Sequence, residues 1–346
     1  MHNIYSYHAK FTPEIPRKFI KKYSNVGDTV LDPFCGCGTT LLEAIKAGRN
    51  TVGIDLSPIG ILCAKVKTTV YDKKLIKNYS EQILELDDNN FLIPNFPDRE
   101  VWFSENVLKK LGQLNYNISK IDDEKYYNLF YLVLLSILNN CSRKRDTWNL
   151  GYIADNVLPN KDRKVDPIKL YKQKIDLLFK RKDFLKNNDL NVECIESDVL
   201  NVNDIKNVDL VVTSPPYPFA VDFIKYHRIV LYWMEKPVEE LSSKEVGARN
   251  KRNKRDAVNN FYTSMEKVYL HIMSMVKVGG LWCMTIGDTT KDKEKISFVN
   301  WTIDLFEKNG WSLEKKSFRY LKNQTMGQKR IKTESILIFR KLKEVD

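Results

Sequence analysis

The feature that most constrains the fold is a strand, a glycine loop and a helix that follow one another in residues 29–48, TVLDPFCGCGTTLLEAIKAG. The strand is expected to end at Asp32. Gly48 is expected to stop the helix, because glycine tolerates the left-handed backbone that often follows a last helical turn. A second strand follows at 50–58, NTVGIDLSP, and leads into another helix. Two strands joined by a helix run parallel, and a parallel sheet needs cover on both faces, so the sequence predicts an α/β protein.

Strands and helices stop alternating between residues 73 and 189, where the apolar spacing is helical. Strand patterns resume beyond this insertion, and the last two, at 312–320 and 334–341, have the form of an antiparallel hairpin. Helices are expected over 220–234 and over 261–280, the second ending at its terminal glycine pair. We therefore predict a mostly parallel sheet with a C-terminal antiparallel hairpin and a helical insertion.

Composition disfavours several classes of protein. The first residues, MHNIYSYHAKF, lack the apolar core of a secretory signal. The longest apolar run, at 129–138, is too short to cross a bilayer. The six cysteines show no CxxC pairing and no nearby histidines, so we expect reduced thiols and no metal. The expected location is the cytoplasm, with no membrane partner.

The formal net charge of +12 favours a polyanionic partner. Part of this excess reflects a general richness in lysine, so local clustering is more informative than the total. Residues 247–255, GARNKRNKR, have no apolar periodicity and are typical of an exposed loop. A loop that is merely solvated is the alternative. The candidate DNA-binding side chains are Arg249, Lys251, Arg252, Lys254 and Arg255.

The glycine loop and two acidic residues beside it indicate a bound nucleoside. Glycines in G-x-G spacing let backbone amides approach a ligand at the carboxyl edge of a sheet. Asp55, at the end of the second strand, is placed to accept both ribose hydroxyls. The third glycine of the dinucleotide fingerprint is replaced by Leu41, and Asp32 would repel a pyrophosphate but suit an amino group. A cofactor with a ribose, an ammonium and no phosphate fits best, and S-adenosylmethionine is such a cofactor.

Two motifs together resemble those of a known enzyme family. Residues 32–40, DPFCGCGTT, and 213–217, TSPPY, are similar to the cofactor and catalytic motifs of DNA methyltransferases that modify cytosine-N4 or adenine-N6. Residues 8–16, HAKFTPEIP, resemble the family segment that closes over the methionine end of the cofactor. The resemblance covers the chain to about residue 72 and again from about 190 to 340. It implies the Rossmann-like fold of S-adenosylmethionine-dependent methyltransferases.

The second motif has a mechanical reason for each residue type. An exocyclic amine is a poor nucleophile because its lone pair is delocalised into the ring, and methyl transfer needs that lone pair aimed along the C–S axis. The hydroxyl of Ser214 and the carbonyl of Pro215 can accept from its two N–H groups. Pro216 restricts Pro215 to extended conformations, and Tyr217 can stack on a base rotated out of the duplex. The family comparison gives these four catalytic positions the same roles.

The candidate cofactor residues come from the N-terminal segment, the glycine loop and two strand ends. Asp198 follows a strand pattern at 191–199, where it can accept from the adenine amino group or cap a helix. The full set is Lys10, Phe11, Thr12, Asp32, Pro33, Phe34, Gly36, Gly38, Thr39, Asp55 and Asp198.

Motif order predicts three parts. Residues 1–72 form the cofactor-binding half, 73–189 the helical insertion and 190–346 the catalytic half. The insertion is the first candidate for target recognition, and the basic loop at 242–257 is the second.

The resemblance implies a site-specific DNA methyltransferase of a restriction-modification system. Cytosine-N4 is favoured as the target because adenine-N6 enzymes of the family usually carry Asp or Asn where this chain has Ser214. Expected partners are double-stranded DNA with a flipped target base and a cognate restriction endonuclease. The alternatives are an adenine-N6 enzyme, an RNA base methyltransferase, a nicotinamide-dependent oxidoreductase and an inactive binding subunit.

Overall fold

A computed structural model describes residues 1–8, 10–143, 159–181, 184–185, 189–291, 294–320 and 333–344. The chain divides into two compact units, each described by itself. The helical unit comprises Met1–His8, Lys65–Asn188 and Ile224–Leu241. The sheet unit comprises Ala9–Ala64, Asp189–Phe223 and Ser242–Asp346.

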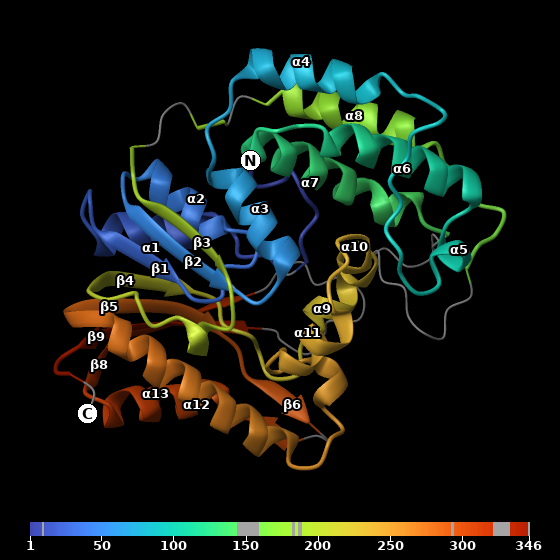
Figure 1. The fold of residues 1–346 in the computed structure, drawn as a ribbon. Coiled ribbons are helices and arrows are strands. Elements are labelled where there is room, and N and C mark those ends of the chain that lie inside the picture. Colours follow the sequence, from blue (N-terminus) through green and yellow to red (C-terminus); the bar gives the residue numbers. More distant parts are fainter. Residues whose placement is uncertain are drawn as a thin grey trace. The chain divides into compact units, whose positions relative to one another are not determined.

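The sheet unit is built on seven strands in the order β3-β2-β1-β4-β5-β9-β8 (Figure 1). Neighbours from β3 to β5 are parallel, and β9 is antiparallel to both β5 and β8. The predicted mostly parallel sheet with an antiparallel hairpin is therefore confirmed. The strands are Thr29–Asp32 (β1), Asn50–Asp55 (β2), Val192–Glu196 (β3), Val208–Thr213 (β4), Val276–Ile286 (β5), Trp311–Tyr320 (β8) and Thr333–Lys341 (β9), with a separate pair Thr289–Lys291 (β6) and Glu294–Ile296 (β7).

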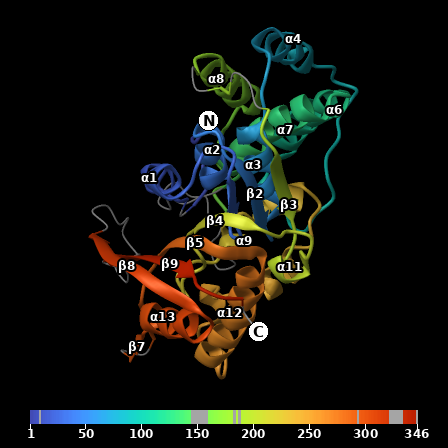
Figure 2. The same ribbon diagram turned by 90° about the vertical axis from the view of Figure 1, so that its left-hand side faces the viewer.

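The central strands β1, β2 and β4 are buried at most positions because both of their faces are covered. In β4, Leu210 and Val212 join one apolar cluster, and Val211 joins another. The first cluster includes residues of Glu14–Tyr23 (α1) and Thr39–Lys46 (α2). Helices Ala257–Met275 (α12) and Phe298–Lys308 (α13) contribute to the second, and Figure 2 shows them beside the strands of the hairpin.

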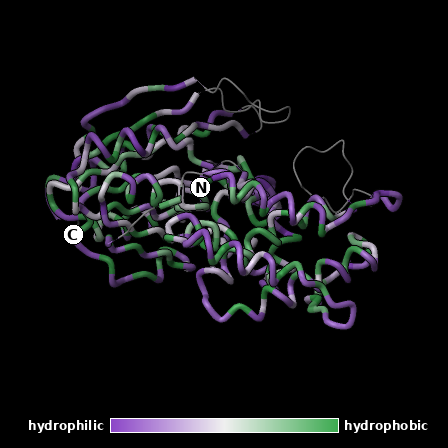
Figure 3. The backbone as a smooth tube through the Cα atoms, turned by 90° about the horizontal axis from the view of Figure 1, so that it is seen from above, coloured by the Kyte–Doolittle hydropathy of each residue, from purple (hydrophilic) through white to green (hydrophobic). Residues whose placement is uncertain are grey.

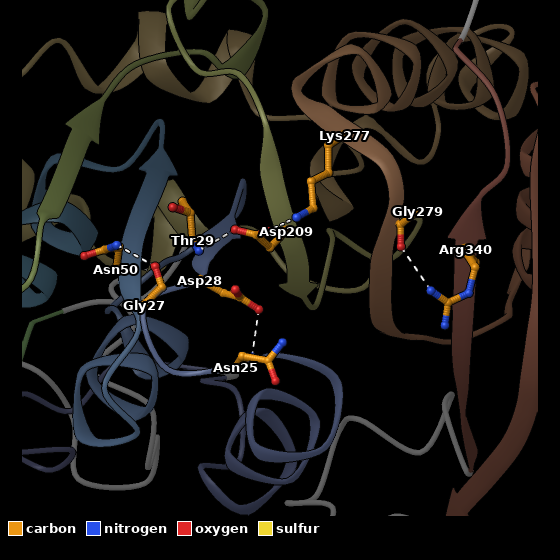
Figure 4. A network of polar contacts seen from close by, with 9 residues as sticks. All are labelled: Asn25, Gly27, Asp28, Thr29, Asn50, Asp209, Lys277, Gly279 and Arg340. Carbon is orange, nitrogen blue, oxygen red and sulfur yellow. Dashed lines mark hydrogen bonds and ion pairs between the residues drawn. The ribbon is translucent and has the colours of Figure 1, made fainter.

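The amino ends of the strands are joined by polar interactions (Figure 4). The Asp209 carboxylate at the start of β4 accepts from the Thr29 amide at 2.8 Å and pairs with Lys277 of β5. Asn50 of β2 donates to the Gly27 carbonyl at 2.8 Å. The glycine loop and the Ser-Pro-Pro-Tyr segment leave the opposite, carboxyl ends of the strands.

The helical unit contains the insertion, and the described residues between 73 and 181 hold no strand. The apolar run at 129–138 lies in the middle of the helix Glu124–Cys141 (α7). This helix packs against Glu105–Ser119 (α6), Pro167–Phe179 (α8) and Arg228–Trp233 (α10), and its burial explains the run. Helices of this unit, or shared with the sheet unit, are Pro58–Thr68 (α3), Lys73–Leu84 (α4), Arg99–Trp102 (α5), Glu105–Ser119 (α6), Glu124–Cys141 (α7), Pro167–Phe179 (α8), Phe223–Tyr226 (α9), Arg228–Trp233 (α10) and Val238–Lys244 (α11).

Hydrophobic and hydrophilic stretches alternate along the backbone (Figure 3). Among the described residues, no helix is both long and apolar enough for a membrane span.

One predicted helix end was wrong. Helix α12 ends at Met275 rather than at Gly279–Gly280, because Val276 already pairs with Val208 as the first residue of β5. The glycines lie inside the strand, where a Cβ at Gly280 would meet the Val276 side chain at 2.6 Å. The glycine pair therefore marks an irregular stretch of strand and not a helix stop.

The predicted helix over 220–234 is also divided, since α9 and α10 are separated at His227. The His227 ring is buried, its Nδ1 lies 3.1 Å from the Tyr5 hydroxyl, and the Tyr7 ring stacks on it at 4.9 Å between centroids. Burial lowers the pKa of His227 to about 3. This neutral ring packs against the N-terminal segment at the residue where the helix is interrupted.

Candidate active site

The loop between β1 and α2 has a shape that favours glycine at two positions. Gly36 and Gly38 have φ angles of 47° and 70°, in the left-handed region. A Cβ at Gly38 would lie 2.7 Å from both Cα and Cβ of Ala64 on α3. The loop backbone therefore packs directly onto α3, so the spacing of the motif has a structural cause as well as a ligand-binding one.

Leu41 occupies the place of the missing third glycine, and its neighbour explains why it fits. A Cβ at Gly53 of β2 would lie 2.6 Å from Cδ2 of Leu41. The glycine at this contact is therefore Gly53 on the strand rather than a residue of the helix, and the Leu41 side chain fills the space beside it. Leu41 is fully buried in a small cluster with Ile61 and Ala64 of α3. This packing differs from the close helix–strand approach that the third glycine of a dinucleotide site permits.

Asp55 ties the end of β2 to the glycine loop. Its Oδ2 accepts from the Gly36 amide at 2.7 Å, and its Oδ1 accepts from the Ser57 amide at 2.8 Å. Burial raises the pKa of this carboxyl, and the two amide hydrogen bonds oppose that rise. A carboxylate has about four acceptor sites, so each oxygen can still accept from a ligand hydroxyl.

Asp32 connects the cofactor loop to the second motif. The side chain is 3% exposed, and its Oδ1 accepts from the Thr213 hydroxyl at 2.7 Å and from the Phe34 amide at 3.2 Å. Burial raises its pKa to about 6, against the effect of the hydrogen bonds from Thr213 and Phe34. Because Thr213 directly precedes Ser214, this hydrogen bond brings the two sequence motifs together at one edge of the sheet.

The Ser-Pro-Pro-Tyr segment begins where β4 ends. Pro215 is buried, whereas Ser214, Pro216 and Tyr217 are partly exposed. The Tyr217 hydroxyl donates to Oε1 of Glu334 at 2.9 Å and lies 3.3 Å from the Thr285 carbonyl oxygen. Burial raises the pKa of Tyr217, and the negative charge of Glu334 adds to the rise. Tyr217 therefore stays a neutral phenol that is held at its hydroxyl end.

The remaining glycine-loop candidates have packing roles. Pro33 and Thr39 are buried, and Phe34 packs against the apolar cluster on the α12 side of the sheet. In the N-terminal segment, Phe11 packs against the cluster on the α1 side, and Lys10 is half-buried. Their roles in cofactor binding stay predictions.

Thr12 and Asp198 have local backbone roles. The Thr12 carbonyl accepts from the Ile15 amide at 3.0 Å where α1 begins. Asp198 caps the 3₁₀ helix Val199–Asn201 (η1) and accepts from the Leu200 amide at 3.1 Å. The neighbouring Ser197 amide donates to the Asp55 carbonyl at 3.1 Å, so the cap lies beside the end of β2. Binding of an adenine by Asp198 stays a prediction.

The basic loop is more ordered than an exposed segment would be. It contains the 3₁₀ helix Arg249–Lys251 (η2). The Lys251 ammonium donates to the carbonyls of Ser243 and Glu245 at 2.6 and 2.7 Å, and burial lowers its pKa. Arg252 donates to the Thr290 carbonyl at 3.2 Å. These two cations fasten the loop, while Arg249, Lys254 and Arg255 are exposed.

The same loop is attached to the chain that follows Tyr217. The Phe219 amide donates to the Gly247 carbonyl at 2.8 Å, and the Asn250 amide donates to the Asp222 carboxylate at 2.7 Å. A Cβ at Gly247 would meet the Phe261 ring at 2.9 Å. The positions of Ser-Pro-Pro-Tyr and the basic loop are therefore coupled through one backbone hydrogen bond and one hydrogen bond to the Asp222 side chain.

Sequence reasoning missed three residues of this edge: Thr213, Thr285 and Glu334. Thr213 is the first residue of the TSPPY motif, so a hydroxyl at the strand end was an available signal. Glu334 and the Thr285 carbonyl reach Tyr217 only because β9 lies beside β5. Local sequence carries no signal for that arrangement.

Comparison with known proteins finds a family match for the region that contains the first motif. A sequence model of the N6/N4 DNA methylase family matches residues 2–61. The type II methyltransferase M.BsoBI of Geobacillus stearothermophilus is 26% identical over 324 residues, covering 80% of this chain and 62% of that protein. M.MvaI of Kocuria varians is 24% identical over 281 residues, covering 69% and 58%.

A shorter match is stronger. M.MjaII of Methanocaldococcus jannaschii is 44% identical over 77 residues, covering 22% of this chain and 14% of that protein. The chain thus spans less than two thirds of the length of each of these relatives. A solved S-adenosylmethionine-dependent methyltransferase of Methanosarcina mazei overlaps 97% of this chain with a TM-score of 0.39 and 9% identity, so the fold assignment rests on the strand order itself.

The glycine loop of the sheet unit lies within the matched region, and Ser-Pro-Pro-Tyr leaves the neighbouring strand at the same edge. Over residues 2–61 the chain is similar to DNA methylases of the N6/N4 family, and over most of its length it is similar to type II methyltransferases.

Proposed function

We propose that this chain is a site-specific DNA methyltransferase that transfers a methyl group from S-adenosylmethionine to the N4 amine of cytosine. The observation that carries the proposal is the 2.7 Å hydrogen bond between Thr213 and Asp32. It joins the end of the cofactor strand to the residue before Ser214, so that cofactor and target amine would be held at one edge of the sheet.

The residues at this edge fit the proposed cofactor. Asp55 has acceptor sites for both ribose hydroxyls, and Asp32 suits the methionine ammonium, whose charge would favour ionisation of that buried carboxyl. The Leu41–Gly53 packing replaces the third glycine of a pyrophosphate site. When bound, S-adenosylmethionine supplies an electrophilic methyl group on its sulfonium.

The second motif would prepare the amine. The Ser214 hydroxyl and the Pro215 carbonyl accept from its two N–H groups, which favours a pyramidal nitrogen and aims the lone pair. The Tyr217 ring stacks on the extruded base. No strong base is needed at Ser214, because the amine becomes acidic as the methyl group arrives and then releases a proton.

Cytosine is favoured over adenine by the residue at the first motif position. Ser214 is shorter than the Asp or Asn of most adenine-N6 relatives, and it is neutral. The Ser214 hydroxyl would therefore lie deeper beneath the base than the acceptor atom of an Asp or Asn side chain. The preference rests mainly on the family resemblance.

The proposed partner is double-stranded DNA with the target base rotated out of the helix. The exposed Arg249, Lys254 and Arg255 would bind phosphates, and the loop that carries them is attached to the segment after Tyr217. Residues 73–189 are the first candidate for reading the target sequence. We place the enzyme in the cytoplasm, paired with a cognate restriction endonuclease.

The test is to incubate the purified chain and S-adenosylmethionine with unmodified DNA and, separately, with RNA, and to digest both to nucleosides for mass spectrometry. N4-methylcytosine in the DNA supports the proposal. If N6-methyladenine forms instead, the target base is adenine. If only RNA is methylated, the substrate is RNA.

A further inference from the structure

We propose that Glu334 is a positioning residue for methyl transfer, because it holds the Tyr217 hydroxyl and thereby fixes the ring that receives the target base. The inference rests on the proposed function. Glu334 is the second residue of β9, which runs antiparallel to β5. The beginning of β9 therefore lies at the carboxyl edge of the parallel strands, where the Ser-Pro-Pro-Tyr segment starts.

Both oxygens of the Glu334 carboxylate have a defined partner. Oε1 accepts from the Tyr217 hydroxyl at 2.9 Å, and Oε2 accepts from Nε of Arg319 at 2.5 Å. Glu334 is 8% exposed, and Arg319 stands directly opposite it in the β8–β9 register. A continuous chain of polar interactions thus runs from the edge strand through Glu334 to the tyrosine of the catalytic motif.

This arrangement holds Tyr217 more tightly than stacking requires. An aromatic face stacks on a base without a hydroxyl, and the Thr285 carbonyl alone would satisfy a buried phenol. Placing a carboxylate there instead carries a desolvation cost, which its hydrogen bonds to Tyr217 and Arg319 offset. A hydroxyl bound to a charged, paired acceptor limits rotation and tilt of the ring. The ring in turn sets the position of the base amine relative to the methyl donor.

The alternative is that Glu334 only fastens the hairpin. A second ion pair, between Arg340 and Glu314, joins the same two strands near the other end of the hairpin, and Arg340 also donates to the Gly279 carbonyl at 3.0 Å (Figure 4). In the β8–β9 register that pair lies far from Glu334, which is the residue that binds Tyr217. It therefore provides a matched control for loss of a hairpin ion pair.

The experiment compares Glu334→Ala and Glu334→Gln in chains that carry Tyr217 and in chains with Tyr217→Phe, with Glu314→Ala as the control. Transfer of tritiated methyl groups from S-adenosylmethionine to unmethylated genomic DNA gives kcat, and calorimetry gives cofactor affinity. Glu334→Ala should lower kcat roughly 10- to 100-fold, the scale expected for a misplaced reactant, with unchanged cofactor affinity. Glu334→Gln keeps an acceptor for the hydroxyl and should lose less.

Coupling between the two residues distinguishes positioning from fold support. With Phe at position 217, substitution of Glu334 should cause little further loss, because the hydroxyl that it holds is absent. Equal losses in both backgrounds, or an equal loss in Glu314→Ala, would overturn the positioning role while leaving the proposed function intact. A wild-type chain that transfers no methyl group to any DNA would overturn both.

Discussion

At the scale of single residues, two carboxylates, the buried Asp32 and the partly exposed Asp55, define the carboxyl edge of the sheet. Asp55 accepts from two backbone amides, which hold the glycine loop. Asp32 accepts from one hydroxyl and one amide, and its pKa of about 6 reflects a burial cost that these bonds do not remove. A ligand with an ammonium would reduce that cost, so Asp32 is better explained by binding than by stability.

The raised pKa of Asp32 predicts a pH dependence of stability in the absence of cofactor. Its folded-state pKa is about 6 and its ordinary value is 3.8, so the folded state favours the protonated form. The stability from this group is fully present below about pH 4 and is lost as the pH rises through 6. Asp32→Asn keeps the shape and removes the titration.

Urea unfolding of both chains at pH 5 and pH 7.5 checks this prediction. The free energy of unfolding of Asp32→Asn relative to wild type should grow by about 1.4 kcal/mol between these two pH values, because the linkage changes by about one unit and each unit corresponds to about 1.4 kcal/mol. The same variant should bind S-adenosylmethionine poorly. A stability difference that does not change with pH would contradict the account.

Asp55 is expected to matter for the cofactor directly. Asp55→Ala should weaken S-adenosylmethionine binding by about 1.5–3 kcal/mol, the value of hydrogen bonds to a charged group. Asp28→Ala is the control, because Asp28 accepts from the Asn25 amide at the opposite edge of the sheet (Figure 4). Calorimetry that finds equal affinities for folded Asp55→Ala and Asp28→Ala would remove Asp55 from the site.

At the scale of elements, the loop before α2 depends on its packing against α3. Gly38 has a left-handed φ, and an added Cβ would collide with the Ala64 backbone. Gly27 has a similar φ of 87°, but its Cβ would meet nothing within 4 Å. The two glycines therefore separate the cost of backbone strain from the cost of a collision.

Alanine substitution at each position gives the comparison. Gly27→Ala should lower the free energy of unfolding by about 1–2 kcal/mol because of the left-handed backbone alone. Gly38→Ala should lower the free energy of unfolding by about 1–3 kcal/mol more than Gly27→Ala, as is typical of overpacking. It should also weaken cofactor binding, because the loop must move. Urea unfolding measures both, and similar losses at the two positions would show that packing against α3 is not a constraint.

The basic loop predicts a salt effect on DNA binding. Replacing Arg249, Lys254 and Arg255 with alanine should reduce the slope of log affinity against log salt by about 0.9 for each phosphate that the loop no longer neutralises. A chain with three α1 lysines replaced, Lys18, Lys21 and Lys22, has the same net charge and serves as the control. If the two variants have equal slopes in fluorescence anisotropy titrations, the loop is only a solvated surface.

Elements with local signals were predictable from sequence. The strand β1, the turn at Gly36 and Gly38 and the Ser57–Pro58 start of α3 each follow from residues within a few positions of one another. The limits of α12 and the break at His227 were not predictable, because each depends on a distant partner. The hydrogen bond between Tyr217 and Glu334 spans 117 residues in sequence and exists only once the hairpin joins the sheet.

At the scale of the whole molecule, the chain divides differently in space than in sequence. The helical unit gathers the N-terminal residues Met1–His8 and the segment Ile224–Leu241 around the insertion. Periodicity identified the insertion as helical, but it carries no information about which remote segments pack with it. The candidate active site lies within the sheet unit, and the three predicted sequence parts keep their proposed roles in cofactor binding, target recognition and catalysis.

The central claim is that the chain methylates a base amine in DNA at a defined sequence and that the Ser-Pro-Pro-Tyr segment holds this amine. Methylome sequencing of a methylation-free host that expresses the wild-type chain, beside one that expresses Ser214→Ala, tests it most directly. The account predicts N4-methylcytosine at one short recognition sequence with the wild-type chain and almost none with Ser214→Ala, although that variant should still fold and bind cofactor. A genome without modified bases, or modification that persists in Ser214→Ala, would contradict it.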